Sequence, residues 1–382
     1  MTDIKGIPMT MNKTTAFPTP AGGRVTLSDI ARAFDVSAMT VSKALNRKQG
    51  VSPEKADAIR SYAKQMGYRP SHAARSLLKG RTHTVGICIR EGHSAKPWGY
   101  PWLYGLMREI GLALKPHDMH AQTCLAPGGI DACRQAIEHF MEIGVESLVI
   151  GPLGALEEYH QLADLLGHCP HALAFDAVDD LPIDHVKWNT YQGGQLLAKH
   201  LADLGHQQIL VLGVSERELR NPHLHVQLNG LRDAAKILGL HIDPDHLIRL
   251  HEVEDIPRVL RDVYSKADAP TAVFCHNDWV AMHAIQTLTQ MGINIPGDVS
   301  LTGFDNLPVA QITTPGLTSV GYDLQAYARK IAQIVVDRVN ARFEPGDDES
   351  DLPSMIRWEL EPQLFVRDST AKSGASTSRR HK

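Results

Sequence analysis

Long apolar runs, paired cysteines and aromatic side chains are all scarce in this sequence of 382 residues. No run of about 18 or more apolar residues occurs, so we expect no membrane-spanning helix. The five cysteines are odd in number and form no Cys-x-x-Cys pair. We therefore expect free thiols in a reducing cytoplasm rather than a disulfide framework or a zinc site.

Sequence signals of enzymes are also missing. The chain has no GxGxxG, no P-loop and no GxSxG in a supporting context, so neither catalysis nor a cofactor is expected. Histidines are numerous, but His93, His223, His225 and His276 do not have the spacing of metal ligands. No metal site is expected from them.

The two ends of the chain are expected to be disordered. Residues 1–23 are rich in Thr, Pro and Gly and lack the apolar core of a signal peptide. Residues 368–382 are mostly small, polar or basic. They lack the leucine heptads that a tetramerising coiled coil would need, so a homodimer is the expected assembly.

Charge is distributed unevenly along the chain, although the formal net charge is only −4. Residues 24–82 contain 12 Lys and Arg against 4 Asp and Glu. Residues 83–382 contain 25 against 38, so a basic head is attached to an acidic body. The basic head indicates a phosphate-backbone partner. The alternative is a solvated surface that happens to be basic.

Three helical patterns follow one another in the basic segment, over residues 26–34, 38–45 and 52–67. The first starts with Thr26-x-x-Asp29, a capping-box variant, and its apolar residues recur at helical spacing. A three-residue turn joins it to the second, which begins at the cap Ser37. This arrangement predicts an all-α helix-turn-helix headpiece over residues 24–69.

The second helix presents its outer face near its N-terminus, and in a helix-turn-helix that face enters the major groove of DNA. Ala38 and Met39 are expected to contact a thymine methyl group or a base edge, and Lys43 to reach guanine or a phosphate. Other side chains carry donors that are expected to position phosphates: Thr40, Ser42 and Asn46.

A short helical pattern, residues 71–79, follows Pro70 and is closed by Gly80. It is too short to be stable alone. One interpretation is an ordinary linker helix that packs on the next domain. The other is a hinge helix that forms only on DNA and inserts Leu77 into the minor groove. Residues 70–82 are assigned as this linker.

From Thr84 onward, short apolar runs alternate with helical patterns, which indicates parallel sheets flanked by helices. Residues 83–367 exceed what one such sheet needs, so we expect two α/β lobes with a ligand-binding cleft between them. The expected strands are residues 85–89, 120–124, 147–150, 171–175, 185–188, 208–213, 247–250, 272–275 and 299–304. The expected helices are residues 103–115, 130–141, 156–166, 191–204, 223–238, 256–264, 279–291 and 324–342.

The headpiece resembles that of the lactose/galactose repressor (LacI/GalR) family. The matching stretches are VTLSDIARAFDVSAMTVSKALN and VSPEKADAIRSYAKQMGYRPSHAARSLLKGRTHTVGI. The body resembles the type I periplasmic-binding-protein-like core of the same family in HLADLGHQQILVLG, HNDWVAMHAIQTLTQMGINIPGDVSLTGFDN and PGLTSV. The resemblance implies a ligand-responsive transcriptional regulator, expected to be a repressor. It would bind a pseudo-palindromic operator as a homodimer, in the cytoplasm and at the nucleoid.

For DNA binding, the resemblance implies a reading helix at residues 38–45, a hinge helix at residues 71–79 and Leu77 as the intercalating leucine. Lys43 stands where the family usually carries Arg, and a lysine lacks the bidentate fork of the guanidinium group. The residues expected at the DNA are Thr26, Ser37, Ala38, Met39, Thr40, Ser42, Lys43, Asn46, Ser71, Ala74 and Leu77.

For the effector, the resemblance implies carboxylate and amide acceptors at strand ends and aromatic walls beside them. Such a site suits a sugar or a related polyol. Gln227 stands where the family usually carries Arg, which indicates an effector that is not a standard one for the family. The residues expected at the effector are Arg90, Trp98, Asp176, Trp188, Asn189, Gln227, Asn277 and Asp305.

Other interpretations stay open for these residues and for the chain. Asp176 and Asp305 could cap the following turn or helix, and the Trp side chains could belong to the core. The aromatic group at residues 98–104 could line the cleft mouth or the dimer face. The chain as a whole could be a periplasmic-type sugar-binding protein without a DNA role, a sugar-processing enzyme, or a corepressor-dependent regulator of a non-sugar metabolite.

Overall fold

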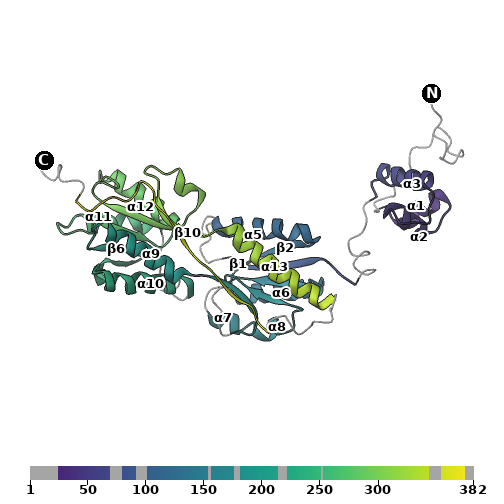
Figure 1. Ribbon diagram of the computed structural model, residues 1–382, viewed down its shortest axis with the longest axis horizontal. Coiled ribbons are helices and arrows are strands. Elements are labelled where there is room, and N and C mark those ends of the chain that lie inside the picture. Colours follow the sequence, from purple (N-terminus) through teal and green to yellow (C-terminus); the bar gives the residue numbers. More distant parts are fainter. Residues whose placement is uncertain are drawn as a thin grey trace, which may run out of the picture. The chain divides into compact units, whose positions relative to one another are not determined.

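Three short helices form the described part of the N-terminal unit, which spans residues 1–82, and two α/β lobes form the second unit, residues 83–382 (Figure 1). The computed structural model describes residues 25–68, 80–91, 101–153, 156–175, 181–213, 222–250, 253–343 and 354–374. The helical pattern at residues 71–79 lies outside the described residues.

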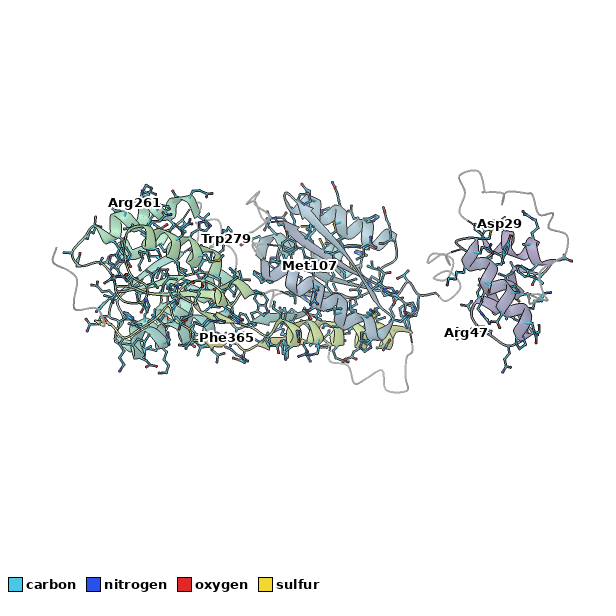
Figure 2. All side chains as sticks on the ribbon, turned by 90° about the horizontal axis from the view of Figure 1, so that it is seen from above. Asp29, Arg47, Met107, Arg261, Trp279 and Phe365 are labelled. Carbon is cyan, nitrogen blue, oxygen red and sulfur yellow. The ribbon has the colours of Figure 1, made fainter. Side chains whose placement is uncertain are left out.

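The helices of the first unit are α1 (Leu27–Phe34), α2 (Ala38–Leu45) and α3 (Pro53–Gln65). Each begins at a side-chain cap, because the first N–H groups of a helix have no partner within it. The predicted capping box is confirmed: Thr26 Oγ1 accepts from the N–H of Asp29, and Asp29 Oδ2 accepts from the N–H of Thr26 at 2.9 Å. Figure 2 labels Asp29 in this unit.

A small apolar core joins these helices. Ile30, Val41 and Ile59 are completely buried, one from each helix. Phe34 and Tyr62 add an edge-to-face aromatic contact with ring centroids 5.4 Å apart. The core places the N-terminal outer face of α2 toward solvent, so the predicted helix-turn-helix architecture is confirmed.

Six parallel strands form the sheet of the first lobe, in the order β11-β5-β4-β3-β1-β2. They are β1 (Thr84–Glu91), β2 (His120–Pro127), β3 (Ser147–Ile150), β4 (Ala172–Ala174), β5 (Asp184–Trp188) and β11 (Arg357–Leu360). The helices are α5 (Pro101–Leu114), η1 (Lys115–His117), α6 (Ile130–Glu142), α7 (Leu156–His160), α8 (Ala163–Gly167) and α13 (Leu324–Phe343). One core contains α5 and α13, and the other contains α6, α7 and α8.

The sheet of the second lobe also has six strands, in the order β12-β10-β9-β8-β6-β7. They are β6 (Ile209–Gly213), β7 (Leu247–Arg249), β8 (Ala272–Cys275), β9 (Ser300–Asp305), β10 (Thr318–Gly321) and the antiparallel edge strand β12 (Gln363–Phe365). The helices are α9 (Thr190–Asp203), α10 (Pro222–Leu238), η3 (Pro244–His246), η4 (Val253–Asp255), α11 (Ile256–Tyr264), α12 (Asp278–Gln290) and η5 (Pro308–Gln311). Again one core lies on each face, with α9 and α10 opposite α11 and α12.

The chain passes between the two lobes three times. The crossings lie between β5 and α9, between β10 and α13, and between β11 and β12. Helix α13 therefore follows a strand of the second lobe but packs beside α5 in the first (Figure 1). Because the crossings follow the carboxyl ends of β5, β10 and β11, they join the lobes where α/β sheets bind ligands.

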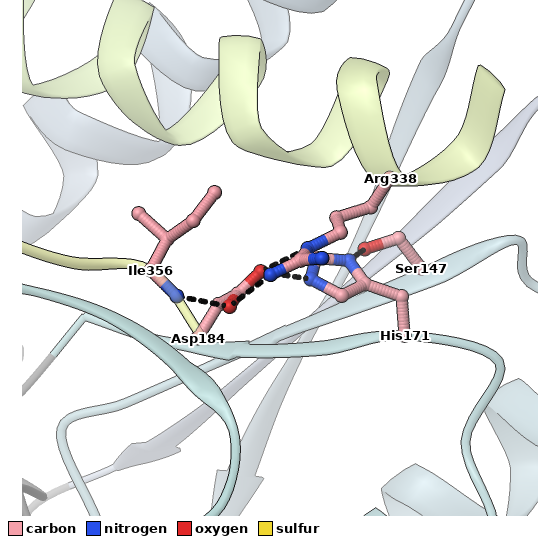
Figure 3. A network of polar contacts seen from close by, with 5 residues as sticks. All are labelled: Ser147, His171, Asp184, Arg338 and Ile356. Atoms are coloured by element: carbon pink, nitrogen blue, oxygen red, sulfur yellow. Dashed lines mark hydrogen bonds and ion pairs between the residues drawn. The ribbon is translucent and has the colours of Figure 1, made fainter. Parts of the chain in front are cut away.

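A buried polar network fixes α13 and β11 to the first lobe (Figure 3). Arg338 of α13 donates two hydrogen bonds to Asp184, at 2.7 and 2.8 Å. The same carboxylate accepts from the N–H of Ile356 at 2.7 Å and contacts His171 Nε2 at 3.0 Å. Burial raises the pKa of Asp184, but the hydrogen bonds from His171, Arg338 and Ile356 outweigh burial and hold that pKa below its ordinary value.

Several elements differ from the expectations drawn from sequence. The expected helix at residues 156–166 is two short helices, α7 and α8. Strands β10, β11 and β12 were not expected from the pattern. The tail also differs over residues 368–374, because Ser369 Oγ donates to Leu301 O at 2.6 Å and Ser373 N to Leu204 O at 2.8 Å. These hydrogen bonds order a segment whose composition is that of a disordered one.

All five cysteines are free thiols, as predicted. Among the described helices, none combines the length and the apolar character that crossing a bilayer requires.

Candidate DNA-binding and effector sites

The reading face of α2 consists of small or flexible side chains that need little rearrangement to touch another molecule. Met39 is 68% exposed, and Ala38 is exposed beside it. Ser37 Oγ accepts from the N–H of Thr40 at 3.1 Å and contacts the Thr40 hydroxyl at 2.9 Å. The cap therefore holds the first turn of α2 rigid, while Ala38 and Met39 remain accessible.

Polar and basic groups continue along the same helix. Asn46 Nδ2 donates to Ser42 O at 2.9 Å, which ends the helix. Lys43 is half-buried, whereas Arg47 (labelled in Figure 2) and Lys48 are exposed just after the helix. These cations and hydroxyls can contact phosphates.

Thr26 and the residues of the expected hinge helix are not part of this exposed face of α2. The Thr26 hydroxyl is engaged inside the capping box, where it donates to Asp29 Oδ2 at 2.7 Å. Ser71, Ala74 and Leu77 lie outside the described residues.

Asp305 is the candidate effector carboxylate, at the carboxyl end of β9 opposite Gly321 of β10. Its backbone has φ 96°, a left-handed conformation that is rare for a residue with a side chain. Burial, and then the charge of Asp278, raise the pKa of Asp305 well above its ordinary value. The carboxyl group therefore favours its protonated form, which can donate one hydrogen bond to a ligand and accept another.

Asp278, at the start of α12, was not singled out by sequence reasoning. Its carboxylate is completely buried and accepts from Ser319 Oγ and from Leu307 N, both at 2.6 Å. Burial raises its pKa to about 7, although both hydrogen bonds lower it. A Cβ on Gly303 would come within 2.2 Å of Asp278 Oδ1, so this position of β9 requires glycine. Asp278 thus ties the segment after β9, and with it Asp305, to β10 and α12.

The amide side chains expected at the effector are largely engaged in structural hydrogen bonds. Asn189 caps α9 by accepting from Gln192 N at 3.0 Å, and Asn277 caps α12 by accepting from Val280 N at 2.8 Å. Gln227 is 3% exposed, and its Nε2 donates to His276 O at 3.1 Å. The cap leaves the Nδ2 group of Asn189 available, whereas Asn277 Nδ2 contacts His276 Nε2 at 3.1 Å, and Gln227 holds the end of β8.

Trp188 ends β5 and lies within an aromatic cluster at the first crossing. Its ring stacks on Tyr322 with centroids 5.1 Å apart and an interplanar angle of 17°. Trp102 of α5 meets it edge-on at 4.4 Å. Trp188 is half-buried and packs against the core of the first lobe. Its buried part agrees with a core residue, and its exposed part can serve as an aromatic wall.

The remaining expected effector residues divide into one described and two that are not. Arg90 donates to Gly128 O at 3.2 Å and is ion-paired with Glu158, so its charge is engaged within the first lobe. Trp98 and Asp176 lie outside the described residues.

One set of side chains has the connectivity of a hydrolase triad. Ser147 Oγ contacts His171 Nδ1 at 2.8 Å, and His171 Nε2 contacts Asp184 at 3.0 Å (Figure 3). Ser147 is completely buried at the amino end of β3, away from the carboxyl ends of the strands where α/β sheets bind ligands. The bidentate Arg338 identifies the set as part of the structural network rather than a nucleophile and its base.

Two family models match this chain. Residues 26–71 match the bacterial regulatory proteins of the lacI family, and residues 198–370 match a periplasmic binding protein-like domain. The transcriptional repressor PurR of Pasteurella multocida is 27% identical over 349 residues, which cover 90% of this chain and 98% of the relative.

Solved structures are similar over most of the chain. A lac repressor dimer bound to operator and the anti-inducer ONPF has a TM-score of 0.72 and 21% identity, covering 91% of this chain and all of that one. A transcriptional regulator CelR–cellobiose complex has a TM-score of 0.63 and 23% identity, with the same coverage.

A helix-turn-helix headpiece joined to a two-lobed periplasmic-binding-like core defines a class of ligand-responsive, DNA-binding regulators of transcription. Within that class, the chain belongs to the LacI/GalR family, as its motifs indicated. It is accordingly a regulator and not an enzyme.

Proposed function

We propose that this chain is a repressor that binds a pseudo-palindromic operator as a homodimer, and that a sugar-like small molecule switches this binding. The observation that carries the proposal is the exposed reading face of α2, with Met39 at its centre, on a basic headpiece. A reading helix of this kind enters the major groove, and two of them in a dimer read half-sites about one helical turn apart or a multiple of it.

The proposed DNA contacts divide by their chemistry. Ala38 and Met39 contact base edges or thymine methyl groups, and Lys43 reaches guanine or a phosphate. Ser37, Thr40, Ser42 and Asn46 position the backbone, and Thr26 stabilises the helix that supports them. Ser71, Ala74 and Leu77 would form the hinge helix in the minor groove.

Dimerisation is proposed through exposed apolar surface of the body. Tyr104 and Leu112 on α5 are 44% and 47% exposed, and Leu125 on the neighbouring edge strand β2 is 37% exposed. Large apolar side chains that stay exposed on an edge strand and on the helix that contacts it favour burial against a second copy. Sedimentation at micromolar concentration should give twice the mass of the chain.

The effector is proposed to bind at the strand ends of both lobes. Asp305 offers a carboxyl group, Asn189 an amide Nδ2 group, and Trp188 and its neighbours offer aromatic rings. Asn277, whose Nδ2 contacts His276, would turn toward the ligand on binding. This combination suits the hydroxyl rim and apolar face of a sugar, and CelR is a relative solved with cellobiose. Arg90, Trp98, Asp176 and Gln227 complete the proposed site. Because Gln227 is neutral, an uncharged effector is favoured over a sugar phosphate.

A second candidate is a non-sugar metabolite that acts as a corepressor. The raised pKa of Asp305 favours its protonated form, which can donate a hydrogen bond to a carbonyl or ring-nitrogen acceptor of such a metabolite. In either case the effector shifts the two-lobed body and changes the affinity for DNA by a coupling free energy of about 1–3 kcal/mol.

Acting on the chromosome, the protein would work in the cytoplasm, at the nucleoid.

The test is operator selection followed by an effector screen. The full chain is incubated with random duplex DNA, the retained sequences are determined, and affinity for the best one is measured by fluorescence anisotropy. A palindromic site bound at nanomolar affinity supports the proposal, and binding without sequence preference contradicts it. Melting-temperature screens against sugars, sugar acids, nucleosides and sugar phosphates then identify the effector class.

A further inference from the structure

Tyr322 occupies the second crossing between the lobes, directly after β10. Its ring stacks on Trp188, which packs against the core of the first lobe. The centroid of the Tyr322 ring also lies 6.1 Å from that of Phe304, which belongs to a core of the second lobe. A ring held between two cores has little freedom to turn. Its hydroxyl is therefore presented at a fixed place.

The hydroxyl oxygen of Tyr322 is buried, and in the described part of the chain it has no hydrogen-bond partner. Buried tyrosine hydroxyls normally find one. The neighbouring Tyr327, whose ring also contacts Trp188, follows this rule: its hydroxyl donates to Val186 O at 2.9 Å. The two tyrosines thus share one aromatic cluster but differ in hydrogen bonding.

The charges around Tyr322 determine which hydrogen bond it can make. Burial, and then the carboxylates of Asp305, Glu359 and Glu361, raise the pKa of its hydroxyl. The phenol therefore stays protonated and can donate. Gln192, in the first turn of α9 after the first crossing, has a buried Oε1 that likewise lacks a partner among the described residues. A free donor and a free acceptor at neighbouring crossings match a ligand hydroxyl, which is both.

We propose that Tyr322 is an effector-binding residue whose hydroxyl donates a hydrogen bond to a polyol effector, while its ring and Trp188 form a fixed aromatic wall. The inference rests on the proposed function, because it assumes that the effector binds where the strand ends of the two lobes meet. It adds a specific determinant that the sequence motifs did not indicate: an effector lacking the matching oxygen would leave the phenol unpaired.

The matched variants are Tyr322→Phe and Tyr327→Phe in the full chain. Each removes one hydroxyl and keeps the ring in the same cluster. Without ligand, Tyr322→Phe should melt at the same temperature as the wild type or higher, because no hydrogen bond is lost. Tyr327→Phe should melt lower, because Val186 O loses its donor. An equal loss of melting temperature in both variants would show that the Tyr322 hydroxyl has a structural partner, and would overturn the proposal.

The second measurement is calorimetric titration with cellobiose, D-galactose and D-ribose. For whichever sugar binds the wild type, Tyr322→Phe should weaken binding about tenfold, the size of one hydrogen bond. Tyr327→Phe should bind as tightly as the wild type. Unchanged affinity in Tyr322→Phe overturns the proposal. If no sugar binds the wild type, the sugar class itself is wrong, and the ligand-free melting temperatures still decide whether the Tyr322 hydroxyl is unpaired.

Discussion

At the scale of single residues, the second lobe holds two carboxyl groups with opposite roles. Asp278 is completely buried and accepts two hydrogen bonds from the protein, whereas the Asp305 carboxyl group makes no side-chain hydrogen bond within the described residues. The first group therefore positions the segment after β9, and the second remains for a ligand. The left-handed backbone of Asp305 is consistent with strain kept at a functional site.

Replacing Asp305 with Asn should abolish the response to effector while operator affinity stays within about twofold, because the headpiece is untouched. The measurement is anisotropy on operator DNA with and without effector. Asp323→Asn is the matched control, because Asp323 is exposed and caps α13 through Ala326 N at 2.8 Å, a role that Asn can keep. A normal response in Asp305→Asn would mean that the effector site is misplaced.

Replacing Arg338 with Ala should lower the free energy of unfolding by about 3–5 kcal/mol, because it leaves the buried carboxylate of Asp184 without its cation. Urea unfolding followed by circular dichroism measures the change. Arg329→Ala provides the contrast, since its contact with Asp323 is 3.9 Å long and exposed, and should change stability by less than about 1 kcal/mol. Comparable losses in both variants would contradict a special role for the network.

The same network predicts a dependence on pH. The pKa of Asp184 is lower in the folded chain than its unfolded value of about 3.9. Its stabilising contribution is therefore complete above the unfolded pKa and is lost as the pH falls below about 4 toward the folded pKa. The difference in unfolding free energy between the wild type and Asp184→Asn should shrink between pH 6 and pH 3. A difference that stays constant would show that the ionised carboxylate contributes nothing.

At the scale of elements, residues 71–79 connect the DNA-binding headpiece to the two-lobed body in the sequence. Leu77→Ala in this segment should weaken operator binding roughly 10- to 100-fold and leave binding to unrelated DNA unchanged, since a minor-groove wedge supports bending of the specific site. Leu78→Ala is the control on the same element. Equal loss on operator and unrelated DNA would favour the interpretation of an ordinary linker.

Elements with strong periodicity were predicted well from the sequence, and elements at edges were not. The helix-turn-helix and the central strands follow from caps and apolar runs such as residues 147–150, because these strands are buried on both faces. Strands β11 and β12 are short and partly exposed, so they lack such a run. The break between α7 and α8 has no strong signal, because the apolar spacing continues across it.

The candidate site was predicted only in part for a related reason. Asp305 ends an apolar strand and belongs to the stretch LTGFDN, which matches the family, so its position was accessible to sequence reasoning. Asp278 and Tyr322 acquire their roles from neighbours distant in sequence, Ser319 for one and Trp188 for the other. Nothing local distinguishes Asp278 from a helix-capping residue. The order of the strands, which brings these partners together, cannot be read from local patterns.

At the scale of the whole molecule, the unequal charge of head and body sets the conditions of binding. The 12 basic residues against 4 acidic ones in residues 24–82 should make operator affinity fall steeply with salt. A plot of log affinity against log salt should have a slope of about −0.9 per phosphate contact. Anisotropy titrations between low and high KCl measure the slope. A flat line would exclude phosphate contacts by the headpiece.

The three crossings also decide the order in which a nascent chain can finish folding. The headpiece is complete once residue 68 has left the ribosome, whereas the first lobe waits for β11 and the second for β12. Neither lobe is therefore finished before residue 360, although domains encoded without interruption can fold as they emerge. A product cut short anywhere between these points would contain the DNA-binding headpiece but neither complete lobe of the effector-binding body. Such a fragment would lose both the pairing of headpieces and the control by effector, so quality control of the last residues protects regulation of the whole.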